Sequence, residues 1–296
     1  MKETTAPTHA WLRGGRAFQL LSYLLLTLAA GWVVFPFLWG VLGAFKPGHQ
    51  ILRIPPTLIA DEWTLQNFRA LTKVFPVARI YANSLFVSTA ATAAQIITSA
   101  MTGYALARFD FPGRQTLFLL ILSTMMVPFF VVLVPLFVMV VSWGWLDTYH
   151  ALIVPVLFTP FGIFLLRQFA MTIPNELLDA ARIDGANEFR IFVQIAMPIL
   201  TPAMGALGIF AFTGIWGDFL WPLFVINTGD LRTLPVALST LVTVNPRGMG
   251  AAGRGTHQLG ILMAGDLIVV VPVLVVFFIF QRYITRGVAL TGMGGH

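Results

Sequence analysis

The sequence predicts an all-α membrane protein with six transmembrane helices. Of its 296 residues, 57% are hydrophobic and 10% are charged, whereas soluble chains average about 45–50% and 25%. Six apolar runs reach the roughly 20 residues that a helix needs to cross a bilayer. They cover residues 18–42, 83–107, 115–141, 150–169, 199–226 and 259–280. Because most of the chain is spanning helix, we expect 1–296 to form a single transmembrane domain.

The charged residues and the absence of cysteine narrow the class further. Without cysteine there is no disulfide framework, thiolate metal site or thiol nucleophile. The net charge of +6 comes from basic residues scattered at the ends of the apolar runs. At those positions they suit lipid headgroups and set membrane topology. We therefore expect contact with membrane lipid and no nucleic-acid partner.

The first apolar run follows a polar stretch that contains Lys2, Arg13 and Arg16. This run is longer than the apolar core of a signal peptide, so we expect a retained first helix. Residues 46–80 are polar and predict an external loop with a short helix near 65–71.

The second and third runs carry internal signals. The second is rich in Ala, Ser and Thr, which predicts close packing against other helices. Gln95 lies within it, and either packing or a polar pathway would explain this residue. The third run contains Pro128 and Pro135, which predict kinks.

Six spans place both termini on one side of the membrane. The short loop 108–114 contains two arginines, whereas the loop 142–149 contains neither Lys nor Arg. Since cytoplasmic loops carry an excess of basic residues, both termini and the segment 172–198 are expected in the cytoplasm.

The segment 172–198 is polar and lies between the fourth and fifth spans. Thr172 is expected to cap a helix that begins at Pro174, and Gly185 to end it in a left-handed conformation. Asn187 would begin a second short helix. The small and acidic side chains of this segment suit contact with a partner protein. The alternative is that the segment is a solvated amphipathic loop. The residues expected to make this contact are Glu176, Asp179, Ala180, Ala181, Asp184, Gly185 and Ala186.

This segment resembles the EAA signature of ABC importer permeases. In that signature Glu-Ala-Ala is followed after three residues by Gly and after nine more by Ile-x-Leu-Pro. This chain has Asp179-Ala180-Ala181, then Gly185, then Ile195-x-Met197-Pro198. The two differences, Asp for Glu and Met for Leu, keep the chemical character. The flanking residues are most similar to the second permease of carbohydrate importers such as the maltose system.

The resemblance implies a type I ABC importer permease in the cytoplasmic (inner) membrane of a bacterium or archaeon. It implies a transport subunit rather than an enzyme, with the loop 172–198 docked in a cleft of a cytoplasmic ATPase. It further implies a sister permease, two ATPase subunits and an external solute-binding protein that delivers a sugar or sugar derivative. The chain has no GxxxxGK[ST] loop to hold ATP phosphates. We therefore expect no cofactor on it, with ATP and Mg bound by the ATPases.

The fifth run contains a cluster of aromatic residues around Asp218. An ionisable residue inside a span marks a functional site by default because its burial is costly. We take Trp216, Asp218, Trp221 and Gln95 as candidates for a pathway or gate. The alternative for the tryptophans is a role as interface anchors.

Two other classes remain as alternatives. A secondary transporter would need a coupling-ion site and repeated halves, and the sequence has no internal repeat. The second alternative is an intramembrane aspartyl protease, because such an enzyme needs two carboxylates that share a proton. Asp218 and Asp266 are the two candidates. The glycine pattern of such proteases is incomplete around both.

Two weaker motifs indicate no additional chemistry. Residues 248–253 match GxGxxG, but no strand precedes them, so we expect a flexible external loop. The five histidines, at positions 9, 49, 150, 257 and 296, are never spaced by four and have no paired acids. We therefore predict no metal site.

Overall fold

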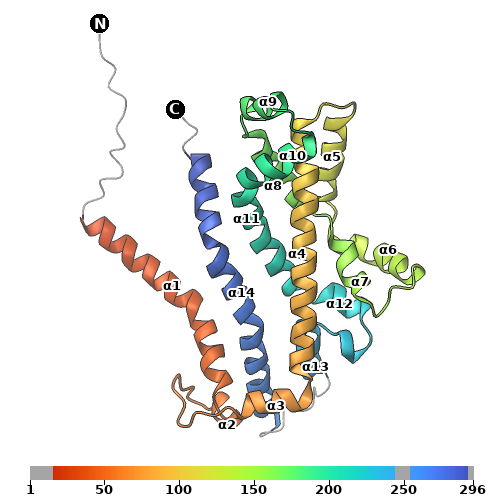
Figure 1. Cartoon of the computed structure of the whole chain (residues 1–296). Coiled ribbons are helices and arrows are strands. Elements are labelled where there is room, and N and C mark those ends of the chain that lie inside the picture. Colours follow the sequence, from red (N-terminus) through yellow and green to blue (C-terminus); the bar gives the residue numbers. More distant parts are fainter. Residues whose placement is uncertain (1–15, 244–253, 293–296) are drawn as a thin grey trace. The chain divides into compact units, whose positions relative to one another are not determined.

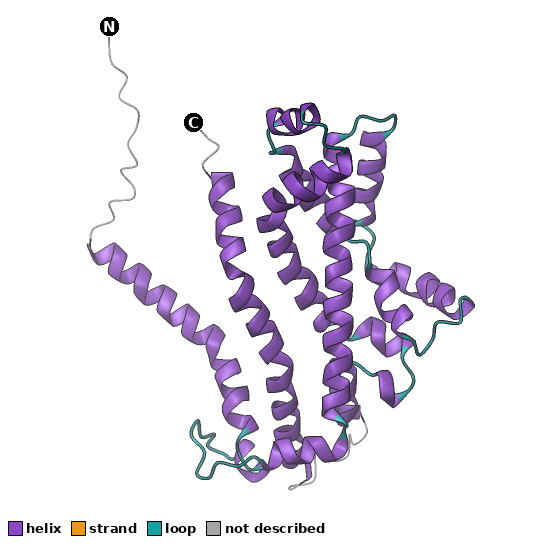
Figure 2. Ribbon diagram, in the orientation of Figure 1, coloured by secondary structure: helices purple, strands orange, loops and turns teal. Residues whose placement is uncertain are grey.

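The computed structural model describes residues 16–243 and 254–292, and within these ranges every regular element is a helix (Figures 1 and 2). The predicted all-α fold class is confirmed. The GxGxxG segment lies outside the described residues. The described chain forms two compact units. The first comprises residues 16–70 and 254–267, and the second comprises 71–243 and 268–292. The single-domain organisation stays a prediction.

Four helical stretches are long and apolar enough to cross a membrane: Phe18–Ala44, Val77–Arg108, Glu188–Trp216 and Gln258–Gln281. Two further candidates are bent pairs. Arg114–Thr124 and Phe129–Ser142 meet at 99°, while Tyr149–Val156 and Pro160–Met171 meet at 43°. If each pair counts as one span, the described chain contains the six spans that the hydrophobic runs predict.

The third and fifth spans differ from their predicted form. The third is broken rather than kinked, into α5 (Arg114–Thr124) and α6 (Phe129–Ser142). Pro128 immediately precedes α6, where its missing N–H and its restriction of the preceding residue favour a new helix start. The fifth span is shifted toward the N-terminus. It begins at Glu188 and its last helix, α11 (Met197–Trp216), is capped by Gly217, so that Leu220–Val225 forms a separate helix, α12.

The first unit contains α1 (Arg16–Ala44), α2 (Gly48–Ile51), the start of α3 (Gln66–Val74) and the start of α14 (Arg254–Gly292). The predicted short helix near 65–71 is confirmed as α3. Buried Asn67 donates to the carbonyls of Ala44 (2.9 Å) and Lys46 (2.8 Å). The Lys46 ammonium donates to the Thr57 carbonyl and lies 5.0 Å from the centre of the Trp39 ring. These contacts fix the polar segment after α1.

The second unit is built around α4 (Val77–Arg108), which packs against α8 (Pro160–Met171) and α11. Small residues make this packing close. A Cβ atom added at Gly103 would lie 2.7 Å from the backbone nitrogen of Arg167, and one at Gly162 would lie 2.4 Å from the Ser99 hydroxyl. The close packing predicted for the second span is confirmed.

One end of α4 holds the segment that leads into α13 (Leu234–Thr243). Asn83 donates to the carbonyls of Asp230 (2.8 Å) and Arg232 (3.3 Å), and the Ser84 hydroxyl accepts from the Leu234 amide (2.7 Å). Asp147 accepts from two backbone amides between α12 and α13, at 2.7 and 2.8 Å. These hydrogen bonds hold the pKa of Asp147 below its ordinary value.

Candidate functional site

A helical hairpin lies at the opposite end of α4 from α13 (Figure 1). It consists of α9 (Asn175–Ile183), the turn after it and α10 (Glu188–Ile191), and we call residues 175–191 the hairpin. The predicted cap at Thr172 is wrong. Thr172 ends α8 instead, and its hydroxyl donates back to the Phe169 carbonyl (2.8 Å). Pro174 occupies the position before α9, which suits its fixed φ angle.

The turn of the hairpin is a Schellman motif. Gly185 has a φ angle of +82°, its amide donates to the Arg182 carbonyl, and the Ala186 amide donates to the Ala181 carbonyl, both at 3.0 Å. Asn187 then starts α10, since its side chain accepts from the Arg190 amide at 2.8 Å. The predicted glycine stop and asparagine restart are both confirmed.

One arginine ties the two arms of the hairpin together. The Arg182 guanidinium donates to both carboxylate oxygens of Glu188, at 2.8 and 3.3 Å, and to Asp179 at 2.7 Å. These bonds, first that to Glu188, raise the pKa of Arg182 above its ordinary value. Bidentate arginine–carboxylate geometry adds directional specificity to the charge attraction. The turn and this cluster together favour movement of the hairpin as one body.

The inner face of the hairpin is anchored in the core of the second unit. Leu178 and Ile191 are buried with Phe192 in a cluster that includes residues of α4, α8 and α11. Ala181 and Ala186 are partly buried and pack against the same cluster. Two of the seven predicted contact residues, Ala181 and Ala186, therefore pack toward the core of the second unit.

The outer face combines acidic and apolar side chains. The other five predicted contact residues are exposed: Glu176, Asp179, Ala180, Asp184 and Gly185. Beside them Ile183 is 86% exposed and Phe189 is 70% exposed. Sequence reasoning missed these two because helical periodicity alone does not say which apolar residues face outward in so short a helix. The surface offers carboxylates for basic side chains and apolar area for burial.

Three of the four candidate pathway residues, Trp216, Asp218 and Trp221, line one small cavity, and Gln95 is not among its lining residues. Three of the four are buried and use their side-chain donors internally: Gln95 to the Val156 carbonyl (2.6 Å), Trp216 to Val269 (2.9 Å) and Trp221 to Ala151 (2.7 Å). Asp218 accepts from the amides of Leu220 and Trp221 and lines this cavity, which has a volume of about 20 Å³. That volume suits one water molecule. Their pathway role stays a prediction.

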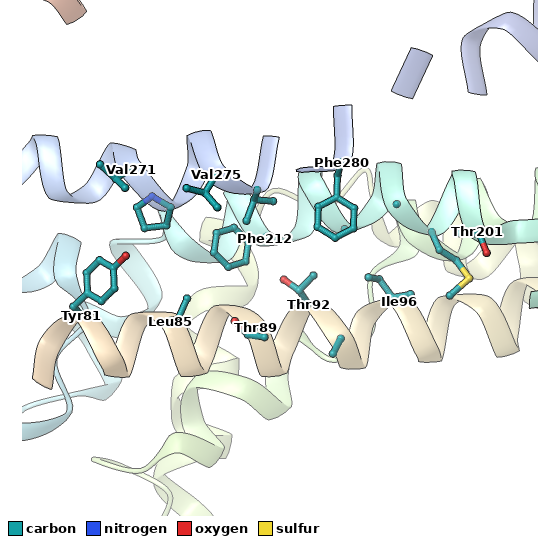
Figure 3. A pocket seen from close by; sticks show the side chains of 16 residues that line it. Tyr81, Leu85, Thr89, Thr92, Ile96, Thr201, Phe212, Val271, Val275 and Phe280 are labelled. Atoms are coloured by element: carbon teal, nitrogen blue, oxygen red, sulfur yellow. The ribbon is translucent and has the colours of Figure 1, made fainter. Parts of the chain in front are cut away.

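A larger groove of about 530 Å³ runs between α4, α11 and α14 within the second unit (Figure 3). Its lining is mainly apolar, with the rings of Tyr81, Phe212 and Phe280 along it. Thr92 lines this groove, and its buried hydroxyl has no hydrogen-bond partner among the described residues. The groove combines faces from three distant segments, so no local sequence pattern indicates it. Among the described residues, no group of three or more His, Cys, Asp or Glu side chains is arranged for a metal ion.

These features are those of a membrane protein that carries, at one end of its second unit, a charged hairpin suited to protein contact. Comparison with known protein families identifies the family of this chain. Residues 95–290 match the model of the binding-protein-dependent transport system inner membrane component, and the chain belongs to this family.

The names of individual relatives are consistent with this family, since they are permease proteins of transport systems. The chain is 36% identical over its whole length to an arabinooligosaccharides transport system permease protein of Halalkalibacterium halodurans, all of which is covered. It is 34% identical to a diacetylchitobiose uptake system permease protein of Streptomyces coelicolor, over 93% of this chain and 88% of that protein. A chain of a bacterial ABC transporter involved in alginate import has the same fold. It matches with a TM-score of 0.80 at 20% identity, over 94% of this chain and 99% of that one.

Proposed function

We propose that this chain is a permease subunit of an ATP-driven importer for an oligosaccharide or a related sugar derivative. The support for the substrate class comes from the relatives, because two permeases with more than 30% identity are named for oligosaccharide uptake. The fold is shared with a transporter of another carbohydrate polymer. The chain itself performs no bond chemistry in this proposal.

The observation that carries the proposal is the hairpin at one end of the second unit. Its exposed carboxylates, at Glu176 and Asp184, suit basic side chains of a partner. Its exposed Ile183 and Phe189 provide apolar area whose burial would stabilise the contact. We assign this surface to an ATPase subunit, and the predicted contact residues to that interface.

The mechanism follows from how the hairpin is held. Its inner face shares a packed core with α4, α8 and α11, and packed cores switch between discrete arrangements rather than deforming continuously. Closure of two ATPase subunits would therefore displace the hairpin as a body and shift these helices. ATP and Mg belong to the ATPases. A sister permease would complete the pathway, and an external binding protein would deliver the solute.

The proposed orientation places the hairpin and both termini in the cytoplasm. The end of α4 and the start of α5, which carry Arg108 and Arg114, lie at the same end of the second unit as the hairpin (Figure 1), as expected for a cytoplasmic side. The segments around α12 and α13 would then face outward. The membrane is the inner membrane, as the family description states, and we assign it to a bacterium or archaeon.

Purification of the tagged full chain from native membranes tests the proposal. We expect a second permease and an ATPase to co-purify, and ATP hydrolysis to rise several-fold when the external binding protein is added with its oligosaccharide. The Glu176→Lys/Asp184→Lys variant should lose most of the ATPase subunit, because each substitution reverses the charge facing the partner. The Asp110→Lys variant is a matched control, since Asp110 is an exposed acid outside the hairpin. A chain that purifies with no nucleotide-hydrolysing partner would contradict the proposal.

A further inference from the structure

Arg108 is the last residue of α4, and its side chain reaches the corner between α8 and α9. Its Nε and Nη2 donate to the Ala170 carbonyl, at 2.9 and 2.6 Å. Nη2 also donates to the Ile173 carbonyl, and Nη1 donates to the Asn175 side chain. One guanidinium therefore contacts the last turn of α8, the linker and the first residue of the hairpin.

The chemistry of this corner favours arginine. The last carbonyls of a helix have no partner within the helix. The Ala170 carbonyl, in the last turn of α8, accepts from the Ile173 amide (3.3 Å) as well as from Arg108, and Ala170 and Ile173 are both buried. Arginine presents five donors in a rigid planar fork, whereas lysine presents three donors at a single point. Lysine could keep the charge but could not span the three acceptor groups in this geometry.

A second contact joins α4 to the residue that follows the hairpin. Tyr104 lies one turn before Arg108, so the two side chains share a face of α4. The Tyr104 ring is buried and its centre lies 5.2 Å from that of Phe192, the residue after α10. Phe192 begins a π-helical turn that leads into α11. The end of α4 thus contacts the chain on both sides of the hairpin.

The opposite end of α4 holds another segment. Asn83 and Ser84 bind the backbone between residues 230 and 234. Along a continuous helix the 25 steps from Asn83 to Arg108 span about 38 Å. A displacement of the hairpin that reaches Arg108 is therefore carried by α4 to the far end of the unit and along the groove that α4 lines.

We propose that Arg108 is the positioning residue through which movement of the hairpin is transmitted to α4. This inference rests on the proposed function. When an ATPase displaces the hairpin, the guanidinium keeps the α8–α9 corner in register with the end of α4. Without it, the hairpin would be linked to α4 only through the apolar core that includes Tyr104, so less of its movement would be converted into movement of α4.

The test uses the full transporter reconstituted in liposomes with its binding protein and an oligosaccharide. For Arg108→Lys we expect normal assembly with the ATPase, but uptake per ATP hydrolysed about tenfold lower, within the usual range of coupling between sites. Asn175→Ala removes one acceptor of Arg108 and leaves both backbone acceptors, so uptake per ATP hydrolysed should fall less than in Arg108→Lys. Arg114→Lys is the matched control, because Arg114 bonds within its own loop, to Asp110 and the Phe109 carbonyl.

Each outcome separates this inference from the proposed function. If the unmodified transporter couples uptake to hydrolysis and Arg108→Lys keeps the same ratio, the inference is wrong and the proposed function stands. Loss of assembly in both Arg108→Lys and Asn175→Ala would make the role purely structural and would also overturn it. Absence of stimulated hydrolysis in the unmodified transporter would instead refute the proposed function.

Discussion

Replacing Gly185 by valine should lower transport-coupled ATP hydrolysis by more than tenfold while the chain still inserts in the membrane. Gly185 has a φ angle of +82°, and nothing lies within 4 Å of a Cβ atom added there. The penalty is therefore conformational rather than steric. A residue with a Cβ pays roughly 1–2 kcal/mol in the left-handed region, and a β-branched residue tolerates it least. Relief of this strain would break the Schellman turn and misalign the two arms.

Two controls make the result specific. Gly185→Asn should keep most of the coupled activity, because asparagine tolerates the left-handed region. Gly113 has a φ angle of +81° and equally open surroundings, but it lies in loop 108–114. Gly113→Val should therefore leave the amount of solute carried per ATP unchanged. Full substrate-stimulated hydrolysis in Gly185→Val at normal expression would show that the hairpin does not couple transport to ATP hydrolysis.

The largest loss of stability should come from Gly103→Ala. An added Cβ would lie 2.7 Å from the Arg167 nitrogen, 3.0 Å from the Leu166 carbonyl carbon and 3.1 Å from the Ile163 oxygen. All three are backbone atoms of α8, so the contact cannot be relieved by a side-chain rotation. Overpacking of this kind typically costs about 1–3 kcal/mol, and it should appear as a lower midpoint of thermal unfolding in detergent.

Gly214 provides the matched control for this substitution. It also lies inside a spanning helix, α11, but nothing lies within 4 Å of a Cβ atom added there. Gly214→Ala should be neutral or slightly stabilising, since alanine favours the helix by up to about 1 kcal/mol over glycine. Equal unfolding midpoints for the two variants would mean that α4 and α8 do not pack as closely as described.

Local patterns predicted the elements whose structure is decided by nearby residues. The Asp184-Gly185 pair indicated the helix stop because the left-handed conformation favours glycine wherever it occurs. The apolar runs indicated the spans because length and hydropathy suffice for that purpose. The prediction for Thr172 was wrong because a threonine two residues before a proline suits a helix start, whereas here its hydroxyl donates to a carbonyl of the preceding helix.

The remaining features depend on contacts between distant segments. Arg108 reaches Ala170 and Asn175, more than 60 residues along the chain, and its sequence position indicated only a basic loop. The pairing of Arg182 with Asp179 follows helix spacing, but its bonds to Glu188 depend on the turn between the arms. The groove that Thr92 lines depends on three helices meeting. Such features follow from the assembled fold.

Cross-linking from the exposed face of the hairpin tests the central claim most directly. The chain contains no cysteine, so a single Ile183→Cys substitution places one thiol on that face. In the native complex we predict that a bifunctional thiol reagent links this variant to the ATPase subunit. Trp63→Cys, an exposed position in the predicted external segment 46–80, should give no such link. Failure of the residue-183 variant to link to any nucleotide-hydrolysing protein, or a link to the ATPase from position 63, would contradict the account.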